Sequence, residues 1–269
     1  MIDYSIVISA YNEESQVTKT LTQVLSFMNS FAPAFEVIVV DDGSKDKTAD
    51  AVEEYAKDHP EIKLIRNIHK GKAGGIRTGM LKSSGKMVLM MDADMATPLE
   101  ELKRLATWIN DNDFDIAIAS REGIGAVRQD EPLYRHIMGR VFNLLVRVVL
   151  GLEFQDTQCG FKLFKGDVAR DIFSRLIIYG DDLPQIDKPF WGAFDVEVLY
   201  CAKQMGYKIK DIPVKWNYVP TTRLNALSNS YKMARDVFRI KILGSKGAYA
   251  MPSETSLVSA PPANAGGLL

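Results

Sequence analysis

Short apolar runs alternate with amphipathic segments over the first 120 residues. The runs are continuous, which is typical of strands covered on both faces of a parallel sheet. They are YSIVISA (4–10), FEVIVV (35–40), IKLIRN (62–67), MVLMM (87–91) and FDIAIAS (114–120). The segments between them have apolar residues at helical spacing. The pattern therefore predicts an α/β domain with a mostly parallel central sheet flanked by helices.

Residues that favour helix starts support this alternation. Asp46 is placed to cap the helix KTADAVEEYAK (47–57), and Pro98 to open PLEELKRLATWIND (98–111). We expect a short helix in RTGMLKSS (77–84), behind a glycine-rich loop that contains Lys72.

The pattern changes after about residue 130, where two basic amphipathic helices are predicted. The first, LYRHIMGRVFNLLVRVVLGL (133–152), is strongly apolar and includes three arginines. The second lies within NALSNSYKMARDVFRIKIL (225–243). The following segment, 245–269, is small, polar and proline-bearing, so we predict that it is disordered.

Composition narrows the functional class. The 269 residues are 46% hydrophobic and 25% charged with a net charge of −1, which fits a globular protein and argues against nucleic acid as a partner. Two cysteines and three histidines match no disulfide framework and no zinc spacing, so a reduced, cytosolic setting is expected. We expect neither a signal peptide nor a spanning helix, because no basic leader and no apolar run of about 18 residues is present.

Polar clusters follow each of the five predicted strands. They are Tyr11–Glu13, Asp41–Ser44, the loop around Lys72, Asp92–Asp94 and Ser120–Arg121. Parallel strands bring their carboxyl ends to one edge of a sheet, where ligands of α/β proteins bind. The five clusters together therefore predict a ligand site at that edge.

The pair Asp92 and Asp94 is the most informative of these clusters. Carboxylates at positions i and i+2 of an extended chain project to the same side, so both can face one cation. Such hard oxygen ligands suit Mg²⁺ or Mn²⁺, which keeps further positions for substrate phosphates. The alternative is that the two carboxylates have no ligand and only cap or solvate the end of the strand. The four other polar clusters at the same edge favour the metal site.

The other clusters each have two interpretations. Asp41 and Asp42 belong either to an ordinary turn or to a contact with a base or ribose. Lys72 is either an exposed lysine or, among glycines, a partner of a diphosphate. Glu13 is favourable at a helix start in any case. Arg121 can bind a phosphate through two hydrogen bonds or form a salt bridge with Asp92 or Glu13.

The order of several motifs resembles that of family 2 GT-A glycosyltransferases. The motifs are SAYNEE, VVDDGSKDKT, GKAGGIRTGM, MDADMATP, ASR, DTQCGFKLF and WGAFDVEVLYCAKQMGYKIKDIPVKW, and the resemblance covers roughly residues 3–220. They look most like the branch that glycosylates dolichyl or polyprenyl phosphate. The resemblance implies a Rossmann-like GT-A fold over residues 1–225, with a nucleotide-sugar half (1–125), an acceptor half (126–225) and a basic helix after them (226–244).

The resemblance also implies roles for individual residues in an inverting, metal-dependent transfer from a nucleotide sugar. Asp94 would be the principal metal ligand, with Asp92 near the ribose or the metal. Tyr11, Glu13, one of Asp41 or Asp42, and Lys72 would hold the donor. Arg121, Arg135 and Lys162 are the candidates for the acceptor phosphate. Asp156 would lie near the reacting centre, either as a base or orienting a basic side chain.

One departure from the family pattern bears on the donor. Mannosyl-phosphate synthases of the branch often carry glutamine two residues after the second aspartate, where this chain has Ala96. This favours UDP-glucose over GDP-mannose. A mannosyltransferase, a transferase with a non-lipid acceptor and a silent nucleotide-sugar-binding module remain as alternatives.

The expected acceptor affects both chemistry and location. A polyprenyl phosphate is largely dianionic at neutral pH, so it needs positive charge and in-line placement more than a base. Cys159 is expected to be a packing residue. Asp195 and Glu197 either cap a helix or contact the acceptor. The basic apolar helices predict a peripheral protein on the cytoplasmic face of a membrane; packing in the core, a homo-oligomer or a membrane subunit would explain them otherwise.

Overall fold

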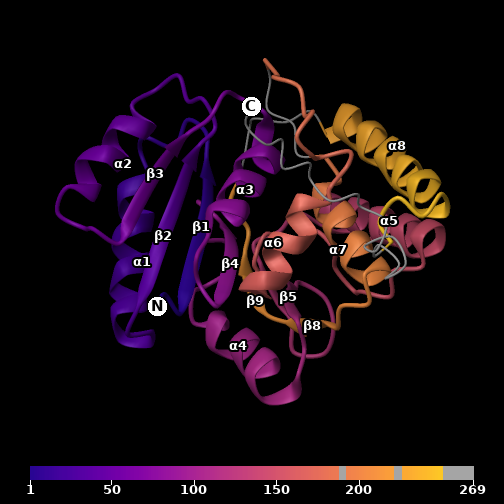
Figure 1. The fold of residues 1–269 in the computed structure, drawn as a ribbon. Coiled ribbons are helices and arrows are strands. Elements are labelled where there is room, and N and C mark those ends of the chain that lie inside the picture. Colours follow the sequence, from indigo (N-terminus) through magenta and orange to yellow (C-terminus); the bar gives the residue numbers. More distant parts are fainter. Residues whose placement is uncertain (188–191, 221–225, 251–269) are drawn as a thin grey trace, which may run out of the picture.

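The computed structural model describes residues 1–187, 192–220 and 226–250. Within them a seven-stranded sheet has the order β3-β2-β1-β4-β7-β5-β8, and β6 pairs with β9 in a second, two-stranded sheet (Figure 1). The strands are β1 (Tyr4–Ala10), β2 (Phe35–Asp41), β3 (Ile62–Arg66), β4 (Met87–Asp92), β5 (Ile116–Ser120), β6 (Val127–Gln129), β7 (Lys162–Lys165), β8 (Ile209–Pro213) and β9 (Lys215–Asn217). The helices are α1 (Val17–Phe31), α2 (Thr48–Ala56), α3 (Gly71–Lys82), α4 (Glu101–Asn112), α5 (Leu133–Leu150), α6 (Gly166–Ser174), α7 (Phe194–Gln204) and α8 (Ala226–Ser245).

The central sheet is parallel except for β7, which confirms the predicted α/β class. β1 pairs in parallel with both β2 and β4, and β5 pairs in parallel with β8. β7 lies antiparallel between β4 and β5, with Leu163 opposite both Leu89 and Ala117. Because β7 runs in the opposite direction, it starts at the edge where the parallel strands end. The loop before Lys162 therefore joins the polar edge.

Each face of the sheet has its own apolar core. Along β4, Val88 and Met90 pack into the core formed with α3, α5, α6, α7 and α8, whereas Leu89 and Met91 pack into the core formed with α1, α2 and α4. All four side chains are at most 1% exposed. Covering both faces explains why the strands are continuous apolar runs.

Helix α3 corrects one prediction from the sequence, because the glycine-rich segment is not a loop but belongs to the helix, which begins at Gly71. A Cβ atom on Gly75 would lie 2.1 Å from Ser9 Oγ, and one on Gly79 would lie 2.3 Å from Val7 Cγ1. The two glycines thus allow α3 to pack directly on β1. Close packing, rather than a flexible loop, accounts for this part of the glycine-rich composition.

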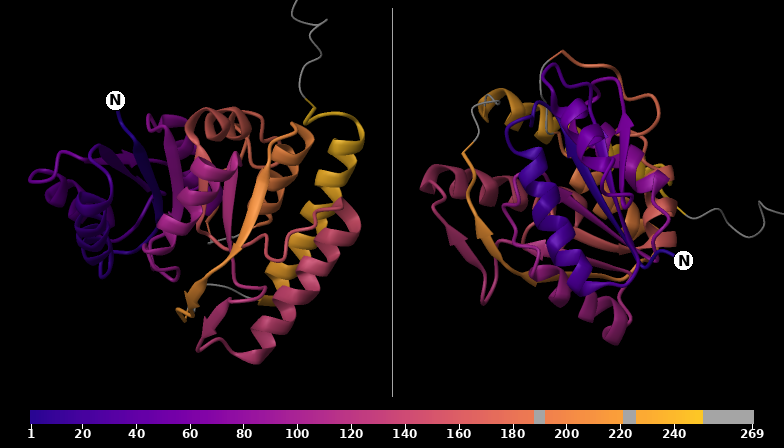
Figure 2. Two further views of the ribbon diagram at one scale, coloured as in Figure 1. Left: turned by 90° about the horizontal axis from the view of Figure 1, so that it is seen from below. Right: turned by 90° about the vertical axis from the view of Figure 1, so that its left-hand side faces the viewer.

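Helices α5 and α8 lie side by side on the outer part of the molecule, with β6 and β9 near one end of the pair (Figure 2). No helix in the described ranges combines the length and apolar character of a membrane span. Beyond α8, Tyr249 is only 1% exposed and its hydroxyl donates to Glu197 Oε1 at 2.7 Å. The ordered chain therefore extends past residue 245, where the sequence placed the start of a disordered tail; residues 251–269 lie outside the described ranges.

Candidate active site

The two aspartates at the end of β4 face a lysine from α3. Asp92 is the last residue of the strand, and Asp94 lies in the turn that follows. Lys72, in the first turn of α3, forms an ion pair with Asp92 Oδ1. A Cβ atom on Gly160 would lie 2.1 Å from Asp92 Oδ2, so the loop before β7 packs directly against this carboxylate. The structure thus brings together residues from three distant parts of the chain.

Negative charge exceeds positive charge around these aspartates. Burial, the neighbouring Asp92 and Glu13 raise the pKa of Asp94 to about 6, although the Ala96 N–H and Lys72 act in the opposite direction. Burial would lower the pKa of Lys72, but Asp92, Asp195 and Asp94 outweigh it and raise this pKa above its ordinary value. Asp195 is paired with Lys162, so Asp92 and Asp94 share the ammonium group of Lys72. Such a site gains from another cation.

The carboxylates fit a hard divalent cation. Among the described residues, no three or more histidine, cysteine, aspartate or glutamate side chains are grouped to hold a metal. Asp92 and Asp94 are thus a two-carboxylate set rather than a closed, all-protein site. Oxygen ligands of this number suit Mg²⁺ or Mn²⁺, which takes its remaining ligands from phosphates and water.

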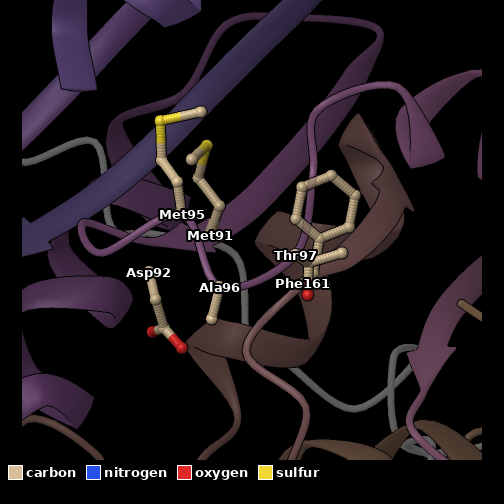
Figure 3. Close-up of a pocket in the computed structure, with 6 residues that line it drawn as sticks. All are labelled: Met91, Asp92, Met95, Ala96, Thr97 and Phe161. Carbon is tan, nitrogen blue, oxygen red and sulfur yellow. The ribbon is translucent and has the colours of Figure 1, made fainter. Parts of the chain in front are cut away.

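A small cavity lies beside the aspartates. Its volume is about 10 Å³, and it is lined by Met91, Asp92, Met95, Ala96, Thr97 and Phe161 (Figure 3). This space suffices for about one water molecule. A nucleotide sugar is far larger than this space.

The residues predicted to bind the nucleoside form a stacked cluster at the ends of β1, β2 and β3. The rings of Tyr11 and His69 stack with centroids 4.0 Å apart and an interplanar angle of 6°. Asp42 lies below, 2.7 Å from His69 Nδ1, and its other oxygen accepts from the Lys70 N–H at 2.9 Å. Asp42 is therefore engaged inside the protein, whereas Asp41 Oδ1 is buried without a hydrogen-bond partner among the described residues.

His69 is a site residue that the sequence analysis missed. The two atoms near its Nδ1, Asp42 Oδ2 and the Asp42 carbonyl oxygen, are both acceptors, so Nδ1 carries the hydrogen. The remaining nitrogen, Nε2, is buried and has no partner within the described residues. A buried polar atom without a partner is costly and points to a ligand. The only signal in the sequence was its place shortly after a predicted strand.

Buried Asp156 and the partly exposed Arg121 form a pair with two hydrogen bonds. Nε and Nη2 of Arg121 donate to the two carboxylate oxygens at 2.6 and 2.9 Å. The backbone N–H groups of Arg121 and Gln158 also donate to this carboxylate, each at 3.0 Å. Burial opposes the charge on Asp156, but these donors outweigh it and hold its pKa well below the usual range.

This geometry bears on the two roles considered for Asp156. A carboxylate with so low a pKa is a weak proton acceptor, so the contacts favour the orienting role. The same pairing raises the pKa of Arg121 although burial would lower it. Nη1 of Arg121 makes no hydrogen bond to any residue in the described ranges.

Lys162 occupies a different environment from that expected of an acceptor-phosphate residue. Its side chain has no exposed surface, and Nζ pairs with Asp195 and donates to the Cys159 carbonyl oxygen. We therefore assign Lys162 no contact with the acceptor. Burial raises the pKa of the Cys159 thiol, in line with a packing role.

Asp195 and Glu197 do not cap α7, because no side-chain hydrogen bond caps that helix. Glu197 is fully buried and accepts from three successive backbone N–H groups, those of Ile177, Ile178 and Tyr179. Its role is to hold this segment against α7.

Comparison with known proteins agrees with this geometry. Residues 5–173 match the model of the family described as "Glycosyl transferase family 2". The dolichyl-phosphate beta-glucosyltransferase of Dictyostelium discoideum is 33% identical over 250 residues, which cover 88% of this chain and 73% of that protein.

Solved structures share the fold at low sequence identity. Mannosyl-3-phosphoglycerate synthase from Rubrobacter xylanophilus has a TM-score of 0.61 at 17% identity, covering 95% of this chain and 78% of that one. The mannosyltransferase PcManGT from Pyrobaculum calidifontis, solved with GDP-Man and Mn²⁺, has a TM-score of 0.53 at 17% identity, covering 95% and 77%. These likenesses confirm the expected GT-A fold. With the family match over most of its length, the chain belongs to glycosyl transferase family 2 and is a hexosyltransferase.

Proposed function

We propose that the protein transfers glucose from UDP-glucose to a dolichyl or other polyprenyl phosphate, with inversion and with Mg²⁺ or Mn²⁺ bound at Asp92 and Asp94. The observation that carries the proposal is the short chain segment from Asp156 to Gly160, which joins the Arg121 pair to the proposed cation site at Asp92. Asp156 binds Arg121, and Gly160 packs on Asp92. Four residues of chain span at most about 14 Å, so a cation site and an available arginine lie within the length of one substrate.

Different residues at this edge are proposed to bind the nucleoside, the diphosphate and the cation. We assign Tyr11, Asp41 and His69 to the nucleoside, with Asp42 holding His69. Lys72 offers positive charge beside Asp92 for the diphosphate, while Glu13 adds to the negative charge that attracts the cation. The bound cation supplies stabilisation of the charge that develops on the leaving diphosphate.

Arg121 has the central role on the acceptor side. The phosphate acceptor has a second pKa near ~6 and is mostly dianionic at neutral pH, so it attacks without losing a proton to the protein. The obstacle is repulsion between this dianion and the donor diphosphate. Arg121, oriented by Asp156, offsets that repulsion, and Arg135 is proposed as a second cation for the same phosphate.

The choice of glucose depends on two observations of different kinds. The Dictyostelium relative is a dolichyl-phosphate beta-glucosyltransferase, and Ala96 replaces the glutamine typical of mannosyl-phosphate synthases. A GDP-mannose donor is the second candidate, because PcManGT, which shares the fold, was solved with GDP-Man and Mn²⁺.

The outer face of α5 is proposed as the surface that meets the lipid bilayer. Large apolar side chains recur along one side of this helix, each more than half exposed; they are Leu133, Ile137, Val141, Leu144 and Val148. Arg140 and Arg147 line a groove of about 240 Å³ with Val141 and Leu144. The helix contains no acidic residue. An apolar stripe edged by arginines fits an anionic bilayer, on the cytoplasmic face of a membrane.

A vesicle assay tests this surface directly. The wild-type protein should sediment with phosphatidylcholine vesicles that contain phosphatidylglycerol, and Leu144→Asp should weaken this. Lys19→Asp, an exposed change on α1, is the control. A membrane role would be contradicted if the wild-type protein did not sediment with these vesicles. It would also be contradicted if the α5 face formed a dimer that Leu144→Asp disrupts.

The transfer reaction is tested in detergent with a short polyprenyl phosphate and Mg²⁺ or Mn²⁺. Labelled UDP-glucose should give a labelled lipid, and labelled GDP-mannose should give little. A mannosylated lipid would show that the donor is GDP-mannose rather than UDP-glucose, while the polyprenyl-phosphate acceptor would stand. Bound donor without any labelled lipid would refute the acceptor.

A further inference from the structure

Two aromatic side chains, Trp216 in β9 and Tyr218 directly after it, each lie against an arginine that is assigned to the acceptor phosphate. The guanidinium carbon of Arg121 lies 5.2 Å from the ring centroid of Trp216. The guanidinium carbon of Arg135 lies 5.2 Å from the ring centroid of Tyr218, and its Nη1 donates to the tyrosine hydroxyl at 3.0 Å. Alternate residues of an extended chain project to one side, which explains how both rings reach arginines from different elements.

We propose that Trp216 and Tyr218 are positioning residues that hold Arg121 and Arg135 in the geometry needed to bind the acceptor phosphate. The inference rests on the proposed function, because it concerns the polyprenyl-phosphate side of the same site.

Each arginine needs a support of this kind for a different reason. Asp156 binds one edge of the Arg121 guanidinium, and the guanidinium carbon lies over the Trp216 ring. Arg135 pairs with no carboxylate among the described residues, so Tyr218 is its main polar contact. Aromatic rings restrain a guanidinium without neutralising it, and the positive charge remains available to an anion.

The segment 216–218, which contains the two rings, is hydrogen-bonded to the turn after β4 and to β6. The Asn217 N–H donates to the Ala96 carbonyl oxygen at 2.8 Å, and the Ala96 N–H donates to Asp94 Oδ1 at 3.0 Å. On its other side, the Tyr218 N–H donates to the Gln129 carbonyl oxygen at 2.9 Å. One short segment therefore fixes the acceptor arginines relative to the turn that contains a metal-binding aspartate.

A purely structural role is the competing explanation, since Trp216 also packs against an apolar core. Trp108 offers a matched control at the opposite edge of the sheet. It packs against the same core, its ring lies 4.5 Å from Lys210 Nζ, and it contacts Phe114, which precedes β5. Trp108→Leu thus removes a ring of the same kind and a similar cation contact, away from the proposed site.

The experiment compares steady-state transfer by the wild-type protein and the variants Trp216→Leu, Trp216→Phe, Tyr218→Phe and Trp108→Leu. Trp216→Leu should raise KM for the polyprenyl phosphate by about 3- to 30-fold, with KM for the donor unchanged. Trp216→Phe should restore most of the loss, because it keeps an aromatic face. Tyr218→Phe should raise the acceptor KM by about threefold or more, since it removes only the hydroxyl bonded to Arg135.

Thermal unfolding separates positioning from packing. Trp216→Leu and Trp108→Leu should lower Tm to a similar extent, while only the former changes the acceptor KM. An unchanged acceptor KM in Trp216→Leu, with the wild-type protein active, would overturn this inference alone. A wild-type protein that glycosylates no polyprenyl phosphate would overturn the proposed function and this inference with it.

Discussion

Replacing Asp156 by asparagine separates the two roles that its position near the reacting centre allows. The carboxylate is 5% exposed and accepts from Arg121 Nε, Arg121 Nη2 and two backbone N–H groups. Asparagine keeps the size of the side chain, but it removes the charge and turns a donor toward the guanidinium. The largely buried guanidinium of Arg121 would then lack an anionic partner.

The expected cost follows from that loss. Breaking a buried ion pair by removing one partner costs about 3–5 kcal/mol, and the partial exposure of Arg121 places this pair near the lower end. At about 2–4 °C per kcal/mol for a domain of this size, Asp156→Asn should lower Tm by roughly 6–12 °C. Transfer should fall as well, because Arg121 loses its orientation.

Thermal unfolding measured by circular dichroism checks this, with Asp58→Asn, an exposed aspartate, as the control. The double variant Arg121→Met with Asp156→Asn should regain part of the lost stability, since it leaves no unpaired charge. If Asp156→Asn kept the wild-type Tm and lost only turnover, the reasoning would be refuted, and a role as general base would be the better explanation.

Three further outcomes concern other parts of the molecule. Burial alone would raise the pKa of Glu36, but hydrogen bonds from Lys63, Ser5 and Ser84 hold it at about 2, against an ordinary value of 4.5. Its contribution to stability is therefore present above about pH 4.5 and is lost as the pH falls toward 2, and Glu36→Gln should flatten that part of a denaturation profile. Gly79→Ala should destabilise the protein in urea by about 1–3 kcal/mol, because its Cβ would overlap the packing of α3 on β1; an unchanged midpoint would contradict the packing role. Lys162→Met should lower the free energy of unfolding by about 3–5 kcal/mol in the same assay, because it leaves Asp195 unpaired. A wild-type stability with a raised acceptor KM would instead show that Lys162 binds the acceptor.

Much of the sheet edge that contains Asp92 and Asp94 could be predicted from the sequence because its signals are local. The apolar runs identified the strands, and the polar residues after each run fall at one edge of the sheet as expected. The pair Asp92 and Asp94 was recognisable because two charges directly follow a buried strand. Such patterns depend only on neighbours along the chain.

The parts that escaped prediction depend on contacts between distant residues. The antiparallel insertion of β7 decides that Asp156 meets Arg121 and that Gly160 meets Asp92. Lys162 was assigned to the acceptor because nothing nearby in the sequence reveals its pairing with Asp195, 33 positions away. The contact of Trp216 with Arg121 likewise requires the order of the strands.

The most direct test of the central claim is the identity of the lipid formed from isotope-labelled UDP-glucose and polyprenyl phosphate in the presence of Mn²⁺. Mass spectrometry of the wild-type reaction should show a polyprenyl phosphate that has gained one labelled hexose. An Asp94→Asn protein with the wild-type circular dichroism spectrum should yield none. Equal amounts of labelled lipid from the well-folded Asp94→Asn protein, or only free labelled glucose from the wild type, would contradict the account.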